Sequence, residues 1–171
     1  MPTAARDRLL AAADRLFYAE GVRAVGVERL LAESGVGRAS FYRHFPGKDD
    51  LVVTVLGERL QRWRADLAAE VEERGGGVLA VFDVLADQAA DPAFRGCAAI
   101  NAMVEVADQD SAAHRVAAEH KEHLAAYLQT LTGDAERARD LLLVVDGALV
   151  TSLRDPGAIG RARRVAGRLF D

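Results

Sequence analysis

Residues 21–51 read GVRAVGVERLLAESGVGRASFYRHFPGKDDL, and this stretch decides the fold. Its apolar residues outline two short helices on either side of a turn. Gly35 suits that turn, because glycine adopts the left-handed backbone conformation that commonly ends a helix without a steric penalty. In the second helix Phe41 and Phe45 fall four residues apart on one face, which leaves polar side chains on the other faces. The pattern is typical of a helix-turn-helix unit, whose second helix enters the major groove of DNA.

Four apolar side chains are expected to hold this second helix in place, namely Leu30, Val36, Phe41 and Phe45. They would pack against the two preceding helices, so that the opposite face is held rigidly for docking. We therefore expect them to be core residues rather than residues that contact DNA.

The other faces carry the residues that we expect to contact DNA. Arg38 and Ser40 are placed to reach base edges, where an arginine can make a bidentate contact with guanine. Residues 42–44 are suited to donate hydrogen bonds to phosphates, and Lys48 combines a charge with the free N–H groups at the start of the next helix. The full predicted set is Arg38, Ala39, Ser40, Tyr42, Arg43, His44 and Lys48.

These residues also have a structural interpretation. An exposed arginine is commonly only solvated surface, and Tyr42 could cover the edge of the core while its hydroxyl stays in water. The formal net charge of −4 is unlike that of an ordinary basic DNA-binding domain. Residues 38–48, however, hold three cationic side chains and no acid, and a small basic patch of this kind is compatible with DNA.

The same stretch resembles the signature of the TetR family of bacterial transcriptional regulators. The matching features are Gly21 after the first helix, Gly35-Val36 in the turn, the run Tyr42-Arg43-His44-Phe45, and Lys48 at the start of the fourth helix. The resemblance covers roughly the first third of the chain. It implies a homodimeric repressor that binds a palindromic double-stranded DNA operator and is released from it when a small-molecule effector binds the C-terminal body.

Two glycines depart from the family pattern. Gly26 stands where the family often has a threonine that caps the second helix and touches a phosphate, and Gly37 stands where a serine or threonine often caps the third. Glycine is an acceptable cap but has no hydroxyl. We therefore expect operator binding to depend more on Tyr42, Lys48 and backbone amides.

The rest of the chain is also expected to be helical. Half of its residues are apolar and only four are prolines, which favours helices and supplies enough apolar surface for a core. The first helix ends at Gly21, with Thr3 as a possible N-cap. After the first three helices, the pattern predicts helices over 48–74, Val78 to Ala90, Ala93 to Val106, Ser111 to Leu131, Ala135 to Leu153 and Ala158 to Leu169.

The predicted fold class is thus all-α with about nine helices. A three-helix DNA-binding domain would occupy residues 1–48, and a helical ligand-binding and dimerisation domain would occupy residues 49–171. The stretch Leu141 to Leu153 is apolar on nearly every face, so it needs cover from a dimer partner and from the last helix. Two-fold symmetry would set the two DNA-reading helices about 34–36 Å apart, one turn of DNA.

Candidate pocket residues in the C-terminal part are apolar side chains with a few polar groups among them. They are Trp63, Phe82, Leu85, Cys97, Asn101, Met103 and Tyr127. The alternative is ordinary core packing, which is what most interior residues do. The stretch FRGCAAIN, residues 94–101, together with His120-Lys121, resembles a TetR subgroup, but this resemblance fixes no particular ligand.

Cys97 is the single cysteine, which excludes an internal disulfide. As an alternative function, Cys97 would sense oxidants or electrophiles if it were exposed and Arg95 favoured its thiolate. A lone cysteine on an apolar segment is otherwise inert packing. The histidines His114, His120 and His123 lack a tight ligand set, so we expect solvated surface there and no metal or other cofactor.

Several function classes lack their signatures. No nucleophile elbow, P-loop, dinucleotide fingerprint or clear pair of carboxylates is present, so we expect no enzyme activity. No apolar stretch approaches the ~20 residues that cross a bilayer, and no signal-peptide pattern is seen, which indicates a cytoplasmic protein with no membrane partner. The main alternative to a ligand-responsive repressor is a TetR-like protein that binds DNA constitutively, with a closed body and no effector.

Overall fold

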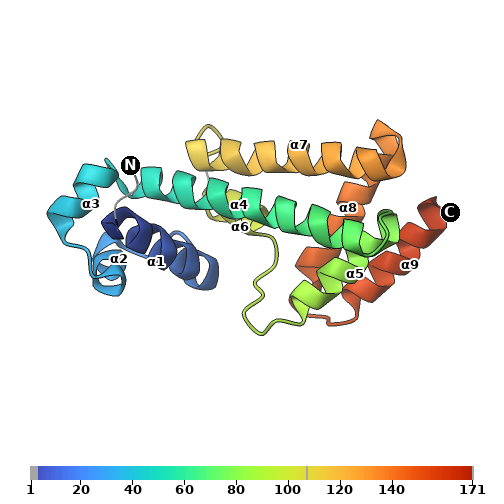
Figure 1. Cartoon of the computed structure of the whole chain (residues 1–171), viewed down its shortest axis with the longest axis horizontal. Coiled ribbons are helices and arrows are strands. Elements are labelled where there is room, and N and C mark those ends of the chain that lie inside the picture. The colour runs from blue at the N-terminus through green and yellow to red at the C-terminus, as the bar shows by residue number, and fades with distance from the viewer. Residues whose placement is uncertain (1–3, 107, 171) are drawn as a thin grey trace. The chain divides into compact units, whose positions relative to one another are not determined.

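The computed structural model describes residues 4–106 and 108–170, and within them the chain forms nine α-helices and no strand (Figure 1). The helices are α1 (Ala4–Glu20), α2 (Val27–Ser34), α3 (Arg38–His44), α4 (Lys48–Glu73), α5 (Val78–Ala89), α6 (Ala98–Glu105), α7 (Ala112–Thr132), α8 (Ala135–Ser152) and α9 (Ala158–Phe170). The predicted all-α fold is confirmed. Thr3, the possible N-cap of the first helix, lies outside the described residues.

Packing divides the chain into two compact units, and α4 and α7 each contribute to both of them. The first unit comprises Met1–Leu60 and Ala98–Ala118, and it includes α1, α2, α3 and α6. The second comprises Gln61–Cys97 and Glu119–Asp171, and it includes α5, α8 and α9. The functional boundary expected after Lys48 stays a prediction.

The first unit is built on the buried face of α1. Its largest fully buried side chains come from α1, α2, α3 and α4, and they are Leu9, Leu16, Leu30, Phe41 and Leu51. Arg59 of α4 adds an ion pair with Asp14 of α1 at 2.8 Å, and its guanidinium lies 3.8 Å from the centre of the Tyr18 ring. These contacts fix the first half of α4 to α1.

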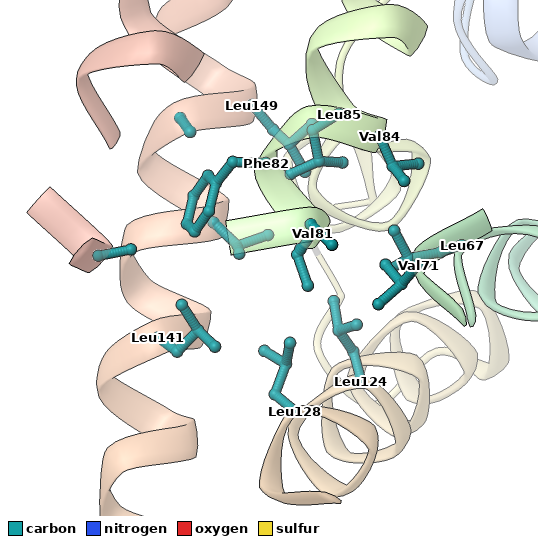
Figure 2. Packing of buried hydrophobic residues seen from close by; sticks show 14 of the residues in the cluster. Leu67, Val71, Val81, Phe82, Val84, Leu85, Leu124, Leu128, Leu141 and Leu149 are labelled. Atoms are coloured by element: carbon teal, nitrogen blue, oxygen red, sulfur yellow. The ribbon is translucent and has the colours of Figure 1, made fainter. Parts of the chain in front are cut away.

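The second unit has an apolar core to which α4, α5, α7, α8 and α9 all contribute (Figure 2). Helix α5 is apolar on most of its faces, so its buried side chains are closely spaced along the helix. Both α5 and α8 pack against α9. Phe82 and Leu85 of α5 are completely buried, among Leu124 of α7 and Leu141 and Leu149 of α8. This core gives the second unit its stability.

One predicted helix begins later than expected. The sequence pattern placed its start at Ala93, but α6 begins at Ala98, so the prediction was wrong over residues 93–97. Gly96 has a φ of +76°, which is left-handed and incompatible with helix. In addition, the Asp91 side chain accepts a hydrogen bond from the N–H of Ala93 at 2.8 Å and so stabilises a turn. The other predicted ends beyond the glycines 75–77 lie within one residue of the observed ends.

Over the described ranges, none of the helices combines the length and the apolar character that crossing a membrane requires.

Replacing Phe82 by alanine should lower the free energy of unfolding by about 3–5 kcal/mol, because the ring is completely buried and its removal leaves a cavity. Urea denaturation followed by circular dichroism measures this loss. The control is Glu122→Ala on the exposed face of α7, which should change stability by less than about 0.5 kcal/mol. Equal losses for the two variants would contradict the assignment of Phe82 to the core.

Candidate functional site

The turn between α2 and α3 is held by its own backbone and by α1. Gly35 follows α2 with φ +63° and ψ 25°, the left-handed conformation that the sequence predicts. The Val36 N–H donates to the Ser34 hydroxyl oxygen at 3.3 Å, and Arg8 Nε of α1 donates to the Ser34 carbonyl oxygen at 3.1 Å. The polar groups of Ser34 are thus bonded within the unit, which fixes the direction in which α3 leaves the turn.

Helix α3 is anchored by the apolar side chains that the sequence singles out. Phe41 is completely buried and Phe45 is nearly so, and the two ring centres lie 6.2 Å apart. Leu30 and Val36 are buried as well, so the prediction that these four residues are core is confirmed. A helix of seven residues is not stable by itself in water. The burial of these rings is therefore what holds α3 in its position.

The residues predicted to contact DNA lie on α3 and at the start of α4. Arg38, Ala39, Tyr42 and Arg43 are exposed, and Ser40, His44 and Lys48 are half-buried. Tyr42 is 49% exposed, and its ring meets Phe41 edge-on with centres 5.1 Å apart. Contact with a core residue thus positions Tyr42 while much of its surface stays open to a partner. Contact of this set with DNA stays a prediction.

Two arginines of α3 have partners within the first unit. Arg38 forms an ion pair with Glu28 of α2, and both side chains are largely exposed. Arg43 donates to the Ser40 hydroxyl oxygen at 3.0 Å. Because exposed ion pairs contribute little to stability, Arg38 can leave Glu28 at small cost.

The two glycine caps are present as the sequence indicates. Gly26 precedes α2 and Gly37 precedes α3, both in extended conformations, and neither cap makes a side-chain hydrogen bond. The α8 helix shows the contrast, since the Asp134 side chain accepts from the N–H of Arg137 at 2.8 Å. The first turns of α2 and α3 thus begin without the side-chain acceptor that α8 has.

The end of α6 is joined to the loop that follows α1, within the first unit. The Glu105 carboxylate accepts a hydrogen bond from the N–H of Arg23 at 3.0 Å. Gly21 has a φ of +91°, and a Cβ built there would lie 2.9 Å from each carboxylate oxygen of Glu105. The backbone conformation therefore favours glycine at position 21, and a side chain there would also displace the Glu105 carboxylate.

The predicted ligand-binding residues are divided between the two units. The second unit contains Trp63, Phe82, Leu85, Cys97 and Tyr127, whereas the first contains Asn101 and Met103. Phe82 and Leu85 are completely enclosed in the core (Figure 2). Trp63, Cys97 and Tyr127 are only partly buried, and they pack at the edge of the same core. Asn101 and Met103 are half-buried on α6. A ligand-binding role for these residues stays a prediction.

His120 is a buried polar residue, although its sequence context predicts a surface position. Only 2% of it is exposed, so the expectation of solvated surface was wrong for this histidine. The spacing of the buried residues on α7 contains the missed signal, because His120 lies three residues after Ala117 and four before Leu124. His123, by contrast, is exposed.

Two residues of α4 contact His120. The Trp63 ring centre lies 5.6 Å from that of the imidazole, and Arg64 Nη1 lies 2.9 Å from Nδ1. Burial, reinforced by the positive charges of Lys121 and Arg64, lowers the pKa of His120 to about 3. The imidazole is therefore neutral at neutral pH. Among the described residues, no cluster of three or more His, Cys, Asp or Glu side chains is arranged to hold a metal ion.

Cys97 lies half-buried just before α6. Its Sγ is 3.4 Å from Lys121 Nζ, and the same ammonium forms an ion pair with Asp146 at 2.6 Å. Sensing of oxidants or electrophiles by this thiol stays a prediction.

Large apolar side chains are exposed on α8 and α9, and they are Leu143, Val150, Val165 and Leu169. Leu143 is 73% exposed. Gly147 lies between Leu143 and Val150 on α8, and a Cβ built there would meet no atom within 4 Å. Exposed apolar groups on two helices that pack together are typical of an interface with another protein surface.

The fold and the anchored α3 define a helix-turn-helix protein. The sequence model of the family described as "Bacterial regulatory proteins, tetR family" matches residues 9–55. SCO4454, a TetR-family transcriptional regulator from Streptomyces coelicolor, is 34% identical, with 98% of this chain and 94% of that chain covered and a TM-score of 0.88. The chain belongs to the TetR family, and its relatives are transcriptional regulators rather than enzymes.

Two further relatives bear on function. The HTH-type transcriptional repressor DrrR1 of Streptomyces coeruleorubidus is 37% identical over 84 residues, which are 42% of this chain and 31% of that protein. The match thus spans about a third of the length of this repressor. The multidrug binding protein EbrR, whose structure is a complex with malachite green, is 27% identical with a TM-score of 0.76, and 97% of this chain and 98% of that chain are covered.

Replacing Gly21 by alanine should destabilise the first unit by about 1–3 kcal/mol, because the left-handed backbone and the Glu105 carboxylate both oppose a side chain. Thermal unfolding measures the effect. Gly57→Ala is the matched control, since Gly57 lies within α4, where a Cβ would make only an ordinary contact with Val116 at 3.8 Å. That control should stabilise the protein slightly, as alanine favours helix. If Gly21→Ala left the thermal stability unchanged, the left-handed geometry of this loop would be contradicted.

Proposed function

We propose that this regulator is a repressor that binds a palindromic DNA operator as a homodimer and leaves it when a small organic effector binds the second unit. The observation that supports DNA binding most directly is the exposed polar face of α3, held in place by the buried rings of Phe41 and Phe45. The name of DrrR1, which is similar over 84 residues, favours repression over activation. A regulator of chromosomal genes would act in the cytoplasm.

The residues predicted to contact DNA have distinct roles in this proposal. Arg38 and Ser40, at the start of α3, reach base edges and provide sequence specificity. Residues 42–44 contact phosphates and set the register of α3 in the groove. Lys48 binds a phosphate with its charge and with the N–H groups of the first turn of α4, because the positive end of the helix dipole favours an anion.

The exposed apolar residues of α8 and α9 support dimerisation. Leu143 and Val150 of α8 and Val165 of α9 would meet the same residues of a second copy, which removes their apolar surface from water. Gly147 favours a close approach of the two copies of α8, since no neighbouring atom of the described residues lies within 4 Å of a Cβ built there. A two-fold dimer then presents two copies of α3 to two half-sites.

The effector part of the proposal has two supports. The EbrR structure contains malachite green, and this chain is similar to EbrR over nearly its whole length. In addition, α4 and α7 each continue from one unit into the other, so the two units are joined by continuous helices through which a displacement would be transmitted. The effector would favour a dimer geometry that does not fit the operator. If no compound releases the protein from DNA, the alternative function is correct, in which the protein binds DNA constitutively and has no effector.

Purified protein should bind the DNA upstream of its own gene in a salt-sensitive manner, as phosphate contacts require. Tyr42→Ala should weaken this binding roughly tenfold or more, and Lys48→Ala should lower the slope of log K against log salt by about one. The measurement is a fluorescence-anisotropy titration at several salt concentrations.

The control for this titration is Glu122→Ala on α7, which should bind DNA as the unmodified protein does. If the protein binds neither this fragment nor any member of a random duplex library, the proposal that it is a repressor is refuted.

Leu143→Glu should shift the protein from dimer to monomer, because a carboxylate would lose its hydration at the centre of the proposed interface. The dissociation constant of the dimer should rise about tenfold or more, as measured by analytical ultracentrifugation, and operator binding should weaken with it. Ala69→Glu, at an exposed position of α4, is the control and should leave the dimer intact. A dimer that tolerates Leu143→Glu would exclude this face as the interface.

A further inference from the structure

His120 has a ring nitrogen with no hydrogen-bond partner among the residues that the structure describes. Its Nε2 is completely shielded from solvent, and no hydrogen-bonding atom among the described residues reaches it. The whole residue is 2% exposed, within the second unit. A buried polar group without a partner costs about 1–3 kcal/mol, so each such group calls for an explanation, such as a bound water, an ion or a role in function.

The contact with Arg64 determines which nitrogen carries the proton. A guanidinium has only donors, so Nδ1, 2.9 Å from Arg64 Nη1, must accept the hydrogen bond. The imidazole is neutral, as its lowered pKa indicates, and a neutral imidazole has one N–H. The proton is therefore on Nε2, which makes the unpartnered atom a buried hydrogen-bond donor.

The surroundings of His120 indicate what kind of acceptor would be bound. Trp63 lies against the imidazole and is itself held by a hydrogen bond from Nε1 to Gln88 Oε1 at 2.9 Å, so its indole has a fixed orientation. The charged groups that act on His120 are cationic, Arg64 and Lys121 among them, and they favour an oxygen with negative partial charge. Lys121 is already paired with Asp146.

We propose that the Nε2–H of His120 is the polar anchor of the effector site, and that the effector is a planar aromatic compound with a carbonyl or carboxylate oxygen. The oxygen accepts the hydrogen bond from Nε2, and the aromatic part packs beside Trp63. This inference rests on the proposed effector function and specifies its ligand class. A preorganised donor of this kind discriminates between ligands, because a ligand without an acceptor leaves the N–H unsatisfied.

The test uses fluorenone and fluorene, which share a planar ring system and differ in the carbonyl oxygen. Equilibrium dialysis against the full chain gives both affinities, and quenching of Trp63, the single tryptophan, reports binding beside it. Fluorenone should bind about tenfold more tightly than fluorene, as expected for one satisfied buried hydrogen bond.

Two variants assign this preference to His120. His120→Phe keeps an aromatic ring but has no donor, so the two compounds should bind it equally. His120→Gln places an amide N–H near the position of Nε2 and should retain part of the preference. A histidine-selective nitrogen NMR spectrum of the unmodified protein provides a readout that needs no variant, because saturating fluorenone should shift the Nε2 resonance of His120.

Three results of the binding measurements would overturn the inference: equal affinity of the unmodified protein for both compounds, no binding of either, or a preference that persists in His120→Phe. An Nε2 resonance that does not move would do so as well. Operator binding that is intact, with release by malachite green but not by fluorenone, would leave the proposed function standing while this ligand class fails. Absence of operator binding would instead refute the proposed function.

Discussion

The burial of two phenylalanine rings is the interaction on which the proposed DNA-binding surface depends. Helix α3 has only seven residues, too few for its own hydrogen bonds to hold it together. Phe41 and Phe45 enter the core of the first unit and remove their rings from water, so that the helix is kept by tertiary packing. The same contact orients the opposite face, since Tyr42 packs edge-on against Phe41 while much of it remains exposed.

The second constraint is the continuity of α4. Its first half is tied to α1 by the ion pair of Arg59 with Asp14 and by the packing of Leu51 and Leu60. Its second half contributes Leu67 to the core of the second unit, beside α5 and α7. One helix thus belongs to the first unit at one end and to the second unit at the other. In the proposed function, this continuity is the route by which a displacement in one unit would alter the other.

The first three helices could be predicted from the sequence because their signals are local: a glycine at a left-handed turn and two phenylalanines four residues apart. The helices of residues 49–171 were less predictable. The alanine-rich composition after Ala93 favours helix, but the left-handed Gly96 delays the start of α6. His120 was expected at the surface because the histidines lack a tight metal-ligand set, although its spacing from Leu124 places it on the buried face of α7. Its contact with Arg64 depends on tertiary packing, which a sequence pattern does not contain.

The central claim is that a two-fold symmetric dimer reads DNA through α3. In vitro selection from random duplexes with the purified chain tests it most directly. The account predicts enrichment of one palindromic sequence, with half-site centres about 34–36 Å apart or a multiple of that spacing. Enrichment of no sequence, or of a single half-site without its symmetric partner, would contradict it.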